Sequence, residues 1–179
     1  MMMAGALLTV VGCATERDEG VCDLENFLAC ARETADERTE LRPIVPWERT
    51  SKYEIIGMDG ERMSYRATEY QFTGGAHGHT AVRVGTINRR TGCRYRLADV
   101  IPEDRRAEVL RQVREDIARR HYGVGSYAEW RAKPEIRFFD EPQLVENFYL
   151  DGKNIHFVYN QYEIACYADG IIEAIAPLP

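Results

Sequence analysis

The stretch NFYLDGKNIHFVYN, residues 147–160, decides the fold, because it has the pattern of two β-strands joined by a tight turn. Asp151-Gly152 lies between the two runs, and Asp-Gly is a strong signal for a two-residue hairpin turn. In the second run, alternate apolar side chains share one face: Ile155, Phe157 and Tyr159. Val158 makes the opposite face apolar as well, which predicts a strand that is central in its sheet.

Two further hairpins are predicted upstream, and one more strand downstream. Residues 52–58 and 61–72 flank Asp59-Gly60, a second Asp-Gly turn signal. Residues 80–88 and 93–97 are expected to pair around a turn near Thr91-Gly92, with polar and apolar side chains alternating in 93–97. Residues 171–176 are expected to form a final strand.

Two main helices complete the predicted fold. A helix is predicted to start at Pro102 and to end before Gly123. Its apolar side chains line one face: Val109, Leu110, Val113 and Ile117. A short turn over 127–133 carries Trp130. Residues 23–40 also show helical periodicity, and a proline-containing connector, 41–50, follows. The sum is an α+β domain, with an antiparallel, hairpin-rich sheet packed against two main helices.

Composition limits the classes of function. A chain of 179 residues is sufficient for one well-packed domain, and its hydrophobic share of 45% is ordinary for a globular protein. The formal charge of −6 disfavours general nucleic-acid binding, which needs a concentrated basic surface. An acidic chain favours a basic partner, or none.

The N-terminal residues predict export. Residues 4–12 are small or apolar, and Val10-Val11-Gly12-Cys13 is similar to the lipobox at which bacterial lipoproteins are cleaved and acylated on cysteine. No Lys or Arg precedes Cys13, in contrast to an ordinary signal sequence. We expect a protein anchored by a lipid on Cys13 outside the cytoplasm, on the periplasmic side or at the cell surface. The alternatives are another export signal and a structural N terminus.

The other cysteines leave the disulfide pairing open. Four remain once the candidate lipid anchor is set aside: Cys22, Cys30, Cys93 and Cys166. In one helix, Cys22 and Cys30 would lie about 12 Å apart, too far for a bridge. Any disulfide would join that helix to Cys93 or Cys166, or link these two to each other, and four free thiols are the alternative.

A glycine-rich passage, YQFTGGAHGHT over residues 70–80, offers two interpretations. Gly74, Gly75 and Gly78 around His77 could form a backbone nest for an anion, or the passage could be a tight connection between strands whose backbone packs closely on a neighbour. His77 and His79 are two residues apart and could face one metal in an extended chain. A hydrogen-bonding role or a contact to a partner is the simpler interpretation of these histidines.

The tyrosine-rich corner near the C terminus is a candidate recognition surface. Tyr162, Glu163 and Tyr167 lie close in sequence, and tyrosine contributes strongly at the centres of interfaces. Core packing of these rings is the alternative. No serine lies in a GxSxG motif, and no local signature supports an activated cysteine. We therefore expect a protein that is not an enzyme and needs no cofactor or metal.

Two motifs carry a resemblance to a known family. TGGAHG, residues 73–78, and the closing pattern that contains YEIA, residues 162–165, resemble the C-terminal domain of the RsiV-like family. That domain occurs in lysozyme-sensing anti-sigma factors, beside polysaccharide deacetylases of the envelope, and alone in bacterial lipoproteins. Cys166 and Ile171 stand where the family usually has proline, so Cys166 is a candidate for a disulfide role.

The resemblance implies a division of the chain and a function. Residues 1–20 would be a lipoprotein-like signal and tether, 21–50 the remnant of a companion domain, and 51–179 the RsiV-like α+β domain. The implied function is a non-enzymatic binding or sensing domain of the cell envelope, and its implied partner is a lysozyme-like basic protein or a peptidoglycan fragment. The candidate binding residues are Gly74, Gly75, His77, His79, Tyr162, Glu163 and Tyr167. The alternative is a metal-dependent envelope hydrolase using His77, His79 and Glu163.

Overall fold

The computed structural model of the protein describes residues 48–133 and 140–179. The predicted helix 23–40, the candidate lipidation site Cys13 and most of the connector 41–50 lie outside the described residues. The described elements follow one another along the chain as β1 (Glu48–Asp59), β2 (Arg62–Phe72), β3 (His79–Asn88), α2 (Leu97–Val100), η1 (Glu103–Arg105), α3 (Arg106–Arg120), α4 (Tyr127–Arg131), β4 (Phe148–Leu150), β5 (Asn154–Tyr159), η2 (Tyr167–Asp169) and β6 (Ile172–Pro177).

The strands form two antiparallel sheets, which confirms the predicted α+β class. The first sheet has the order β1-β2-β3 and the second the order β4-β5-β6, so β5 is central as predicted. The two Asp-Gly turns occur where the sequence predicts them, and Gly60 and Gly152 adopt φ angles of +57° and +92°. Glycine suits both positions because a side chain strains this left-handed region.

The predicted pairing of residues 80–88 with 93–97 forms only in part: Asn88 N donates to Cys93 O and Tyr95 N to Thr86 O, but no regular strand follows. The structure has one isolated bridge, Ile87 to Arg94, after which α2 begins at Leu97. Leu97 N is the next group that would pair with β3, and it donates to the carboxylate of Glu146 instead. Asp99 accepts from Arg96 N and so stabilises the start of the helix. The chain therefore turns into a helix where sequence alternation suggested a strand.

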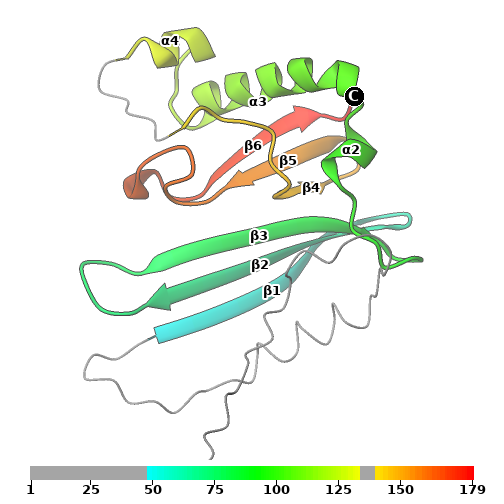
Figure 1. Ribbon diagram of the computed structural model, residues 1–179, viewed down its shortest axis with the longest axis horizontal. Helices are drawn as coiled ribbons and strands as arrows, with labels where there is room; N and C mark the ends of the chain where they lie inside the picture. Colours follow the sequence, from blue (N-terminus) through cyan, green and yellow to red (C-terminus); the bar gives the residue numbers. More distant parts are fainter. Residues whose placement is uncertain (1–47, 134–139) are drawn as a thin grey trace, which may run out of the picture.

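The main core lies between the second sheet and α3 (Figure 1). The predicted helix exists over Arg106–Arg120, and Val109, Val113 and Ile117 on its inner face are buried. One face of β5 and β6 packs against them, contributing Ile155, Phe157, Tyr159, Ile172, Ala174 and Ala176. Trp130 of α4 is fully buried and stacks on Tyr122 with a ring-centroid distance of 4.7 Å.

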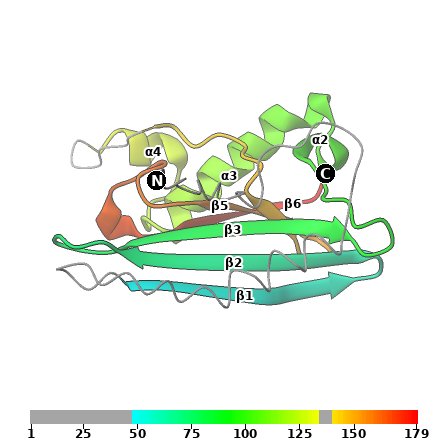
Figure 2. The same ribbon diagram turned by 60° about the horizontal axis from the view of Figure 1, so that its bottom comes forward.

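The opposite face of the second sheet meets the first sheet. Val82 and Val84 of β3 form a small apolar cluster with Val158 of β5. Figure 2 shows β3 as the strand of the first sheet nearest to β5. In the part of the chain that is described, no helix has the length and apolar character needed to cross a membrane.

Side-chain amides connect the edge of β3 to the second sheet. Asn147 Oδ1 accepts from Val84 N at 2.9 Å, and Asn147 Nδ2 donates to Val82 O and Val158 O, each at 2.9 Å. Asn160 Oδ1 accepts from Val82 N at 2.6 Å. The backbone groups on the exposed edge of β3 are thereby hydrogen-bonded without a fourth strand.

Candidate functional site

The glycine passage is the connection between β2 and β3. Gly74 and Gly75 adopt φ angles of +94° and +111°, which glycine reaches without steric strain. Gly78 is buried, and a Cβ atom at this position would overlap the ring of Tyr70. The structure therefore supports the interpretation of a tight passage with its backbone against a neighbour.

The passage and the tyrosine corner meet in space although about 90 residues separate them in sequence. The His77 and Tyr167 rings stack with a centroid distance of 3.8 Å and an interplanar angle of 23°. The Tyr167 hydroxyl donates to Gly78 O at 3.0 Å, and His77 Nδ1 lies 3.1 Å from the same oxygen. We call the surface formed by residues 73–78 and 162–170 the loop–corner site.

Tyr162 gives this site an exposed ring on a strained backbone. Its φ angle is +69°, a region that is rare for a residue with a bulky side chain, and its ring lies 6.0 Å from that of Tyr167. Tyr162 is 45% exposed, one of the most exposed large hydrophobic residues described. Strain of this kind persists only where surrounding contacts enforce it, and it is concentrated at functional sites.

Glu163 fixes the turn that carries Tyr162. Its carboxylate accepts from Asn160 N at 2.8 Å and from Asn160 Nδ2 at 3.2 Å. Gln161 Oε1 accepts from Thr80 N at 3.1 Å, which connects the same turn to the start of β3. The corner is thus attached to the first sheet just beyond the glycine passage.

His79 does not join the other predicted residues. It begins β3, opposite Gln71, and its side chain is exposed. Within residues 48–133 and 140–179, no group of three or more His, Cys, Asp or Glu side chains is arranged to hold a metal ion. Of the seven predicted binding residues, the structure brings the rings of three together: His77, Tyr162 and Tyr167. Gly74 and Gly75 belong to the same passage as His77, and Glu163 directly follows Tyr162.

A groove of about 710 Å³ adjoins the corner. Its lining contains three acidic residues and two tyrosines among nine residues: Asp140, Glu141, Gln143, Val145, Asn147, Tyr159, Tyr162, Glu163 and Ile164. No basic side chain lines it, although Arg114 and Arg131 pair with Glu141. The groove therefore offers carboxylates and the exposed ring of Tyr162 to a ligand, whereas Tyr159 is buried in its wall.

A partly buried polar cluster around His156, on the side of the second sheet that faces the first, escaped sequence analysis. His156 Nδ1 lies 2.8 Å from Glu173 Oε1, and His156 Nε2 lies 2.8 Å from Asp151 Oδ2. Glu173 also accepts from the Tyr149 hydroxyl at 2.8 Å and pairs with Arg66 of β2 at 2.6 Å. The available signal was His156 itself, a polar residue inside a run that is apolar on both faces.

Hydrogen bonding sets the charge states in this cluster. The bond from His156, with those from Tyr149 and Arg66, lowers the pKa of Glu173 to about 2 against the opposing effect of burial. Burial disfavours a charged His156, but its hydrogen bonds to Glu173 and Asp151 outweigh burial and raise its pKa. The two carboxylates thus favour the charged form of the imidazole between them, and the Arg66–Glu173 ion pair connects this cluster to the first sheet.

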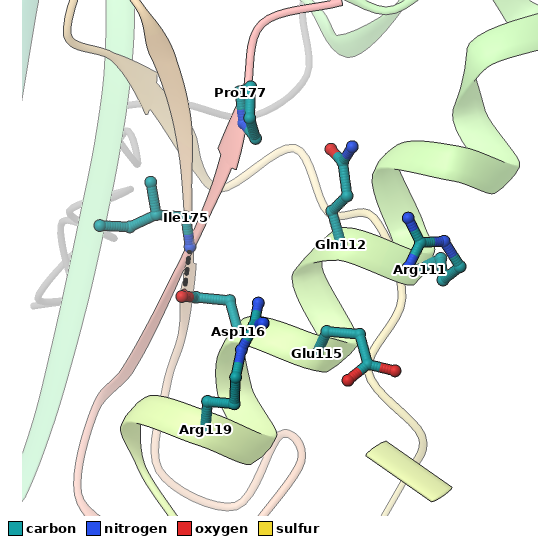
Figure 3. A pocket seen from close by; sticks show the side chains of 7 residues that line it. All are labelled: Arg111, Gln112, Glu115, Asp116, Arg119, Ile175 and Pro177. Atoms are coloured by element: carbon teal, nitrogen blue, oxygen red, sulfur yellow. Dashed lines mark hydrogen bonds between the residues drawn. The ribbon is translucent and has the colours of Figure 1, made fainter. Parts of the chain in front are cut away.

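A second groove, of about 400 Å³, lies between α3 and β6 (Figure 3). Asp116 crosses its floor and accepts from Ile175 N at 2.8 Å. Arg111 is paired with Glu108, and Arg120 with Asp116. This groove contains none of the residues that the sequence predicts for binding, and the contacts of Asp116 tie the helix to the strand.

The cysteines are partly resolved by the structure. Cys166 is a free, exposed thiol, whereas Cys93 is disulfide-bonded. The disulfide role expected for Cys166 is therefore wrong, and a Cys93–Cys166 bridge is excluded. Cys166 Sγ lies instead 2.8 Å from Asp169 Oδ2, within the corner.

Comparison with known proteins places the fold. Residues 98–178 match a family model described as a protein of unknown function, DUF3298. This match covers α3 to β6, including the corner, but begins after the glycine passage. Comparison with curated proteins gives no match.

Two solved structures of DUF3298 family proteins are similar to the chain. One, from Bacteroides fragilis NCTC 9343, has 19% identity and a TM-score of 0.63, covering 86% of this chain and 60% of that chain. The other, from Pseudomonas aeruginosa PAO1, has 19% identity and a TM-score of 0.58, covering 73% of this chain and 58% of that chain. The chain spans less than two thirds of either protein, and the likeness concerns the fold.

Proposed function

We propose that the protein is a non-enzymatic binding domain of the cell envelope whose ligand is a basic protein of the lysozyme type. The observation that carries the proposal is the loop–corner site, in which two distant segments unite as one aromatic surface beside an acidic groove. The proposal goes beyond the match to DUF3298, because it depends on the resemblance of the TGGAHG and YEIA motifs to the RsiV-like family.

The chemistry of the surface suits a cationic ligand. Tyr162 presents an exposed ring at the rim of the groove, and Glu163 and Asp140 supply carboxylates along its lining. Lysine and arginine side chains interact with carboxylates and with aromatic faces. A chain with a net charge of −6 would also attract a basic protein from a distance, which accelerates association.

The existing contacts of the site favour binding over bond cleavage. His77 is stacked on Tyr167, and Glu163 is hydrogen-bonded to Asn160 at the base of its own turn. Both side chains thus hold the local backbone in shape, as residues of a rigid recognition surface do. A peptidoglycan fragment is the second ligand to test, since sugars also pack on exposed tyrosine rings.

Location in the envelope, by a lipid on Cys13, is part of the proposal. The lipobox-like residues support it, and so does the disulfide at Cys93, because disulfides persist in oxidising compartments outside the cytoplasm. Metabolic labelling with a lipid precursor would test it. Labelling that is lost on Cys13→Ser is the expected result, and no labelling of the wild-type protein would contradict it.

Binding can be tested on the immobilised protein. We expect saturable binding of lysozyme at physiological salt, weakened as ionic strength rises. Tyr162→Ala should lower the affinity about tenfold, which corresponds to about 1.4 kcal/mol. Glu163→Gln should lower it by a smaller factor and reduce the salt dependence, while its amide oxygen still accepts from Asn160 N. Glu103→Gln is a matched control, because Glu103 is an exposed acid outside the groove.

The outcomes separate the candidate ligands. Binding of peptidoglycan fragments that is insensitive to salt and to Glu163→Gln would replace the basic protein with a glycan. Absence of saturable binding to both ligands would contradict the proposal. Stoichiometric zinc in untagged protein, lost on His77→Ala, would instead favour the metal-dependent hydrolase.

A further inference from the structure

The face of the first sheet that is turned away from the second sheet is apolar in the two rows nearest the Asp59-Gly60 turn. Residues paired across antiparallel strands point to the same side, so the register defines its rows. One row runs Met58–Met63–Ile87, and the next runs Ile55–Tyr65–Gly85, with the Tyr65 ring lying over Gly85. We call these two rows the outer face. At its β1 side, Ile55 is 62% and Met58 is 65% exposed.

The alternating residues of β2 show which face is turned outward. Ser64 donates to Leu150 O at 2.6 Å, and Arg66 reaches Glu173, so both point to the second sheet. Met63 and Tyr65 alternate with them and therefore point the other way. Large apolar side chains gathered on one sheet face are a sign of a covering partner.

Cys93 indicates which part of the protein supplies that cover. Cys93 is disulfide-bonded, and Cys166, the only other cysteine in residues 48–133 and 140–179, is free. The remaining cysteines all precede β1 in sequence: Cys13, Cys22 and Cys30. Within one chain, the crosslink must therefore return from this preceding segment to Cys93.

The positions of β1 and Cys93 fix the path of that segment. Cys93 lies at the Met58 end of the sheet, because Asn88 N donates to Cys93 O at 2.8 Å and Asn88 lies opposite Arg62, next to Asp59. The chain enters β1 at the other end, at Glu48. Since a strand of this length spans about 36 Å at roughly 3.3 Å per residue, the segment must run back along the sheet to reach Cys93.

We propose that residues 22–47 cover the outer face and are tied to Cys93 by a disulfide from Cys22 or Cys30. Both cysteines are far enough from Glu48 in sequence to span the distance: with the chain helical to residue 40 and extended beyond it, even Cys30 reaches about 40 Å. The segment has the matching chemistry, because its predicted helix carries an apolar stripe: Leu24, Phe27, Leu28, Ala31 and Ala35. The proposal is independent of the ligand at the loop–corner site.

Peptide mapping of the full-length oxidised protein, digested without reduction, tests the tether. The expected result is a peptide containing Cys93 linked to one containing Cys22 or Cys30, which separates on reduction. A Cys93–Cys166 link, a Cys93–Cys93 link between two copies, or an unlinked Cys93 thiol would overturn the proposal.

Thermal unfolding tests the cover itself. Ile55→Ser should lower the Tm of the oxidised full-length protein by about 5 °C, because the side chain would be buried under the segment. Lys52→Ser, a neighbouring substitution on β1 whose side chain is 69% exposed, should change it by no more than about 1 °C. In Cys93→Ser protein, the effect of Ile55→Ser should shrink. Equal, small shifts for both substitutions in the oxidised protein, or a dimer by sedimentation that Ile55→Ser disrupts, would assign the face to solvent or to a second copy.

Discussion

Replacement of Asn147 by alanine should destabilise the protein, because it removes the hydrogen bonds that connect the two sheets. The Asn147 side chain makes three hydrogen bonds of 2.9 Å to backbone groups of β3 and β5. A typical intramolecular hydrogen bond stabilises a protein by about 0.5–1.5 kcal/mol net, so three together contribute about 3 kcal/mol. A loss of this size is a large fraction of the stability of a domain, which is about 5–15 kcal/mol.

Urea unfolding of the oxidised protein provides the measurement. Asn147→Ala should lower the free energy of unfolding by about 3 kcal/mol with little change in m. Asn147→Asp should cost at least as much, because it keeps an acceptor for Val84 N but directs a carboxylate at two carbonyl oxygens. Asn154→Ala is the control: its amide bonds only to Asp151 in an exposed turn, so a loss of about 0.5 kcal/mol is expected. Two results would refute the role of Asn147 in connecting the sheets: a loss of unfolding free energy below about 1 kcal/mol for Asn147→Ala, or an unchanged unfolding free energy for Asn147→Asp.

Three further perturbations test other parts of the structure. The Glu173–His156 pair should stabilise the protein most between about pH 4.5 and 6.5. Because the pKa of Glu173 is lowered in the folded state, the stabilisation from Glu173 declines as the pH falls below 4.5. Because the pKa of His156 is raised, the stabilisation from His156 declines as the pH rises through the folded-state pKa. Urea midpoints against pH, with Glu173→Gln removing the acid limb, measure this. Gly78→Ala should cost about 1–3 kcal/mol because its Cβ displaces the Tyr70 ring, and Tyr70→Ala should relieve part of that cost in the double variant; an additive double variant would contradict the contact. Native protein should react with maleimide at Cys166, and the labelled peptide that contains Cys166 should be absent from Cys166→Ser protein; native protein in which the Cys166 peptide stays unlabelled would contradict a free, exposed thiol.

The hairpins and the long helix could be predicted because their signals are local. Asp59-Gly60 and Asp151-Gly152 impose turns on four consecutive residues, and the spacing of Val109, Val113 and Ile117 repeats within one helix. The prediction for residues 93–97 was less successful, because it also used only local signals. The alternation of these residues matched a strand, but Glu146, 49 residues away from Leu97, took the N–H group that pairing would have used.

The division into two sheets could not be read from the sequence. Asn147 and Asn160, which lie before β4 and after β5, occupy the edge of β3 through hydrogen bonds between residues more than 60 positions apart in sequence. In sequence these are polar residues at strand ends, indistinguishable from solvated ones. The partly buried cluster around Glu173 was missed for a related reason, since its partner Arg66 lies 107 residues away in the other sheet.

The same long-range hydrogen bonds from side-chain amides give the loop–corner site its shape. The glycine passage is held at one end by β3, and the corner follows directly from β5, so the relative position of His77 and Tyr167 depends on how these two strands are joined. Gln161, directly before the corner, makes a similar contact: its amide oxygen accepts from Thr80 N, one residue into β3. Because β3 and β5 do not pair directly as strands, side chains set their register, and the aromatic surface is as rigid as those side-chain contacts.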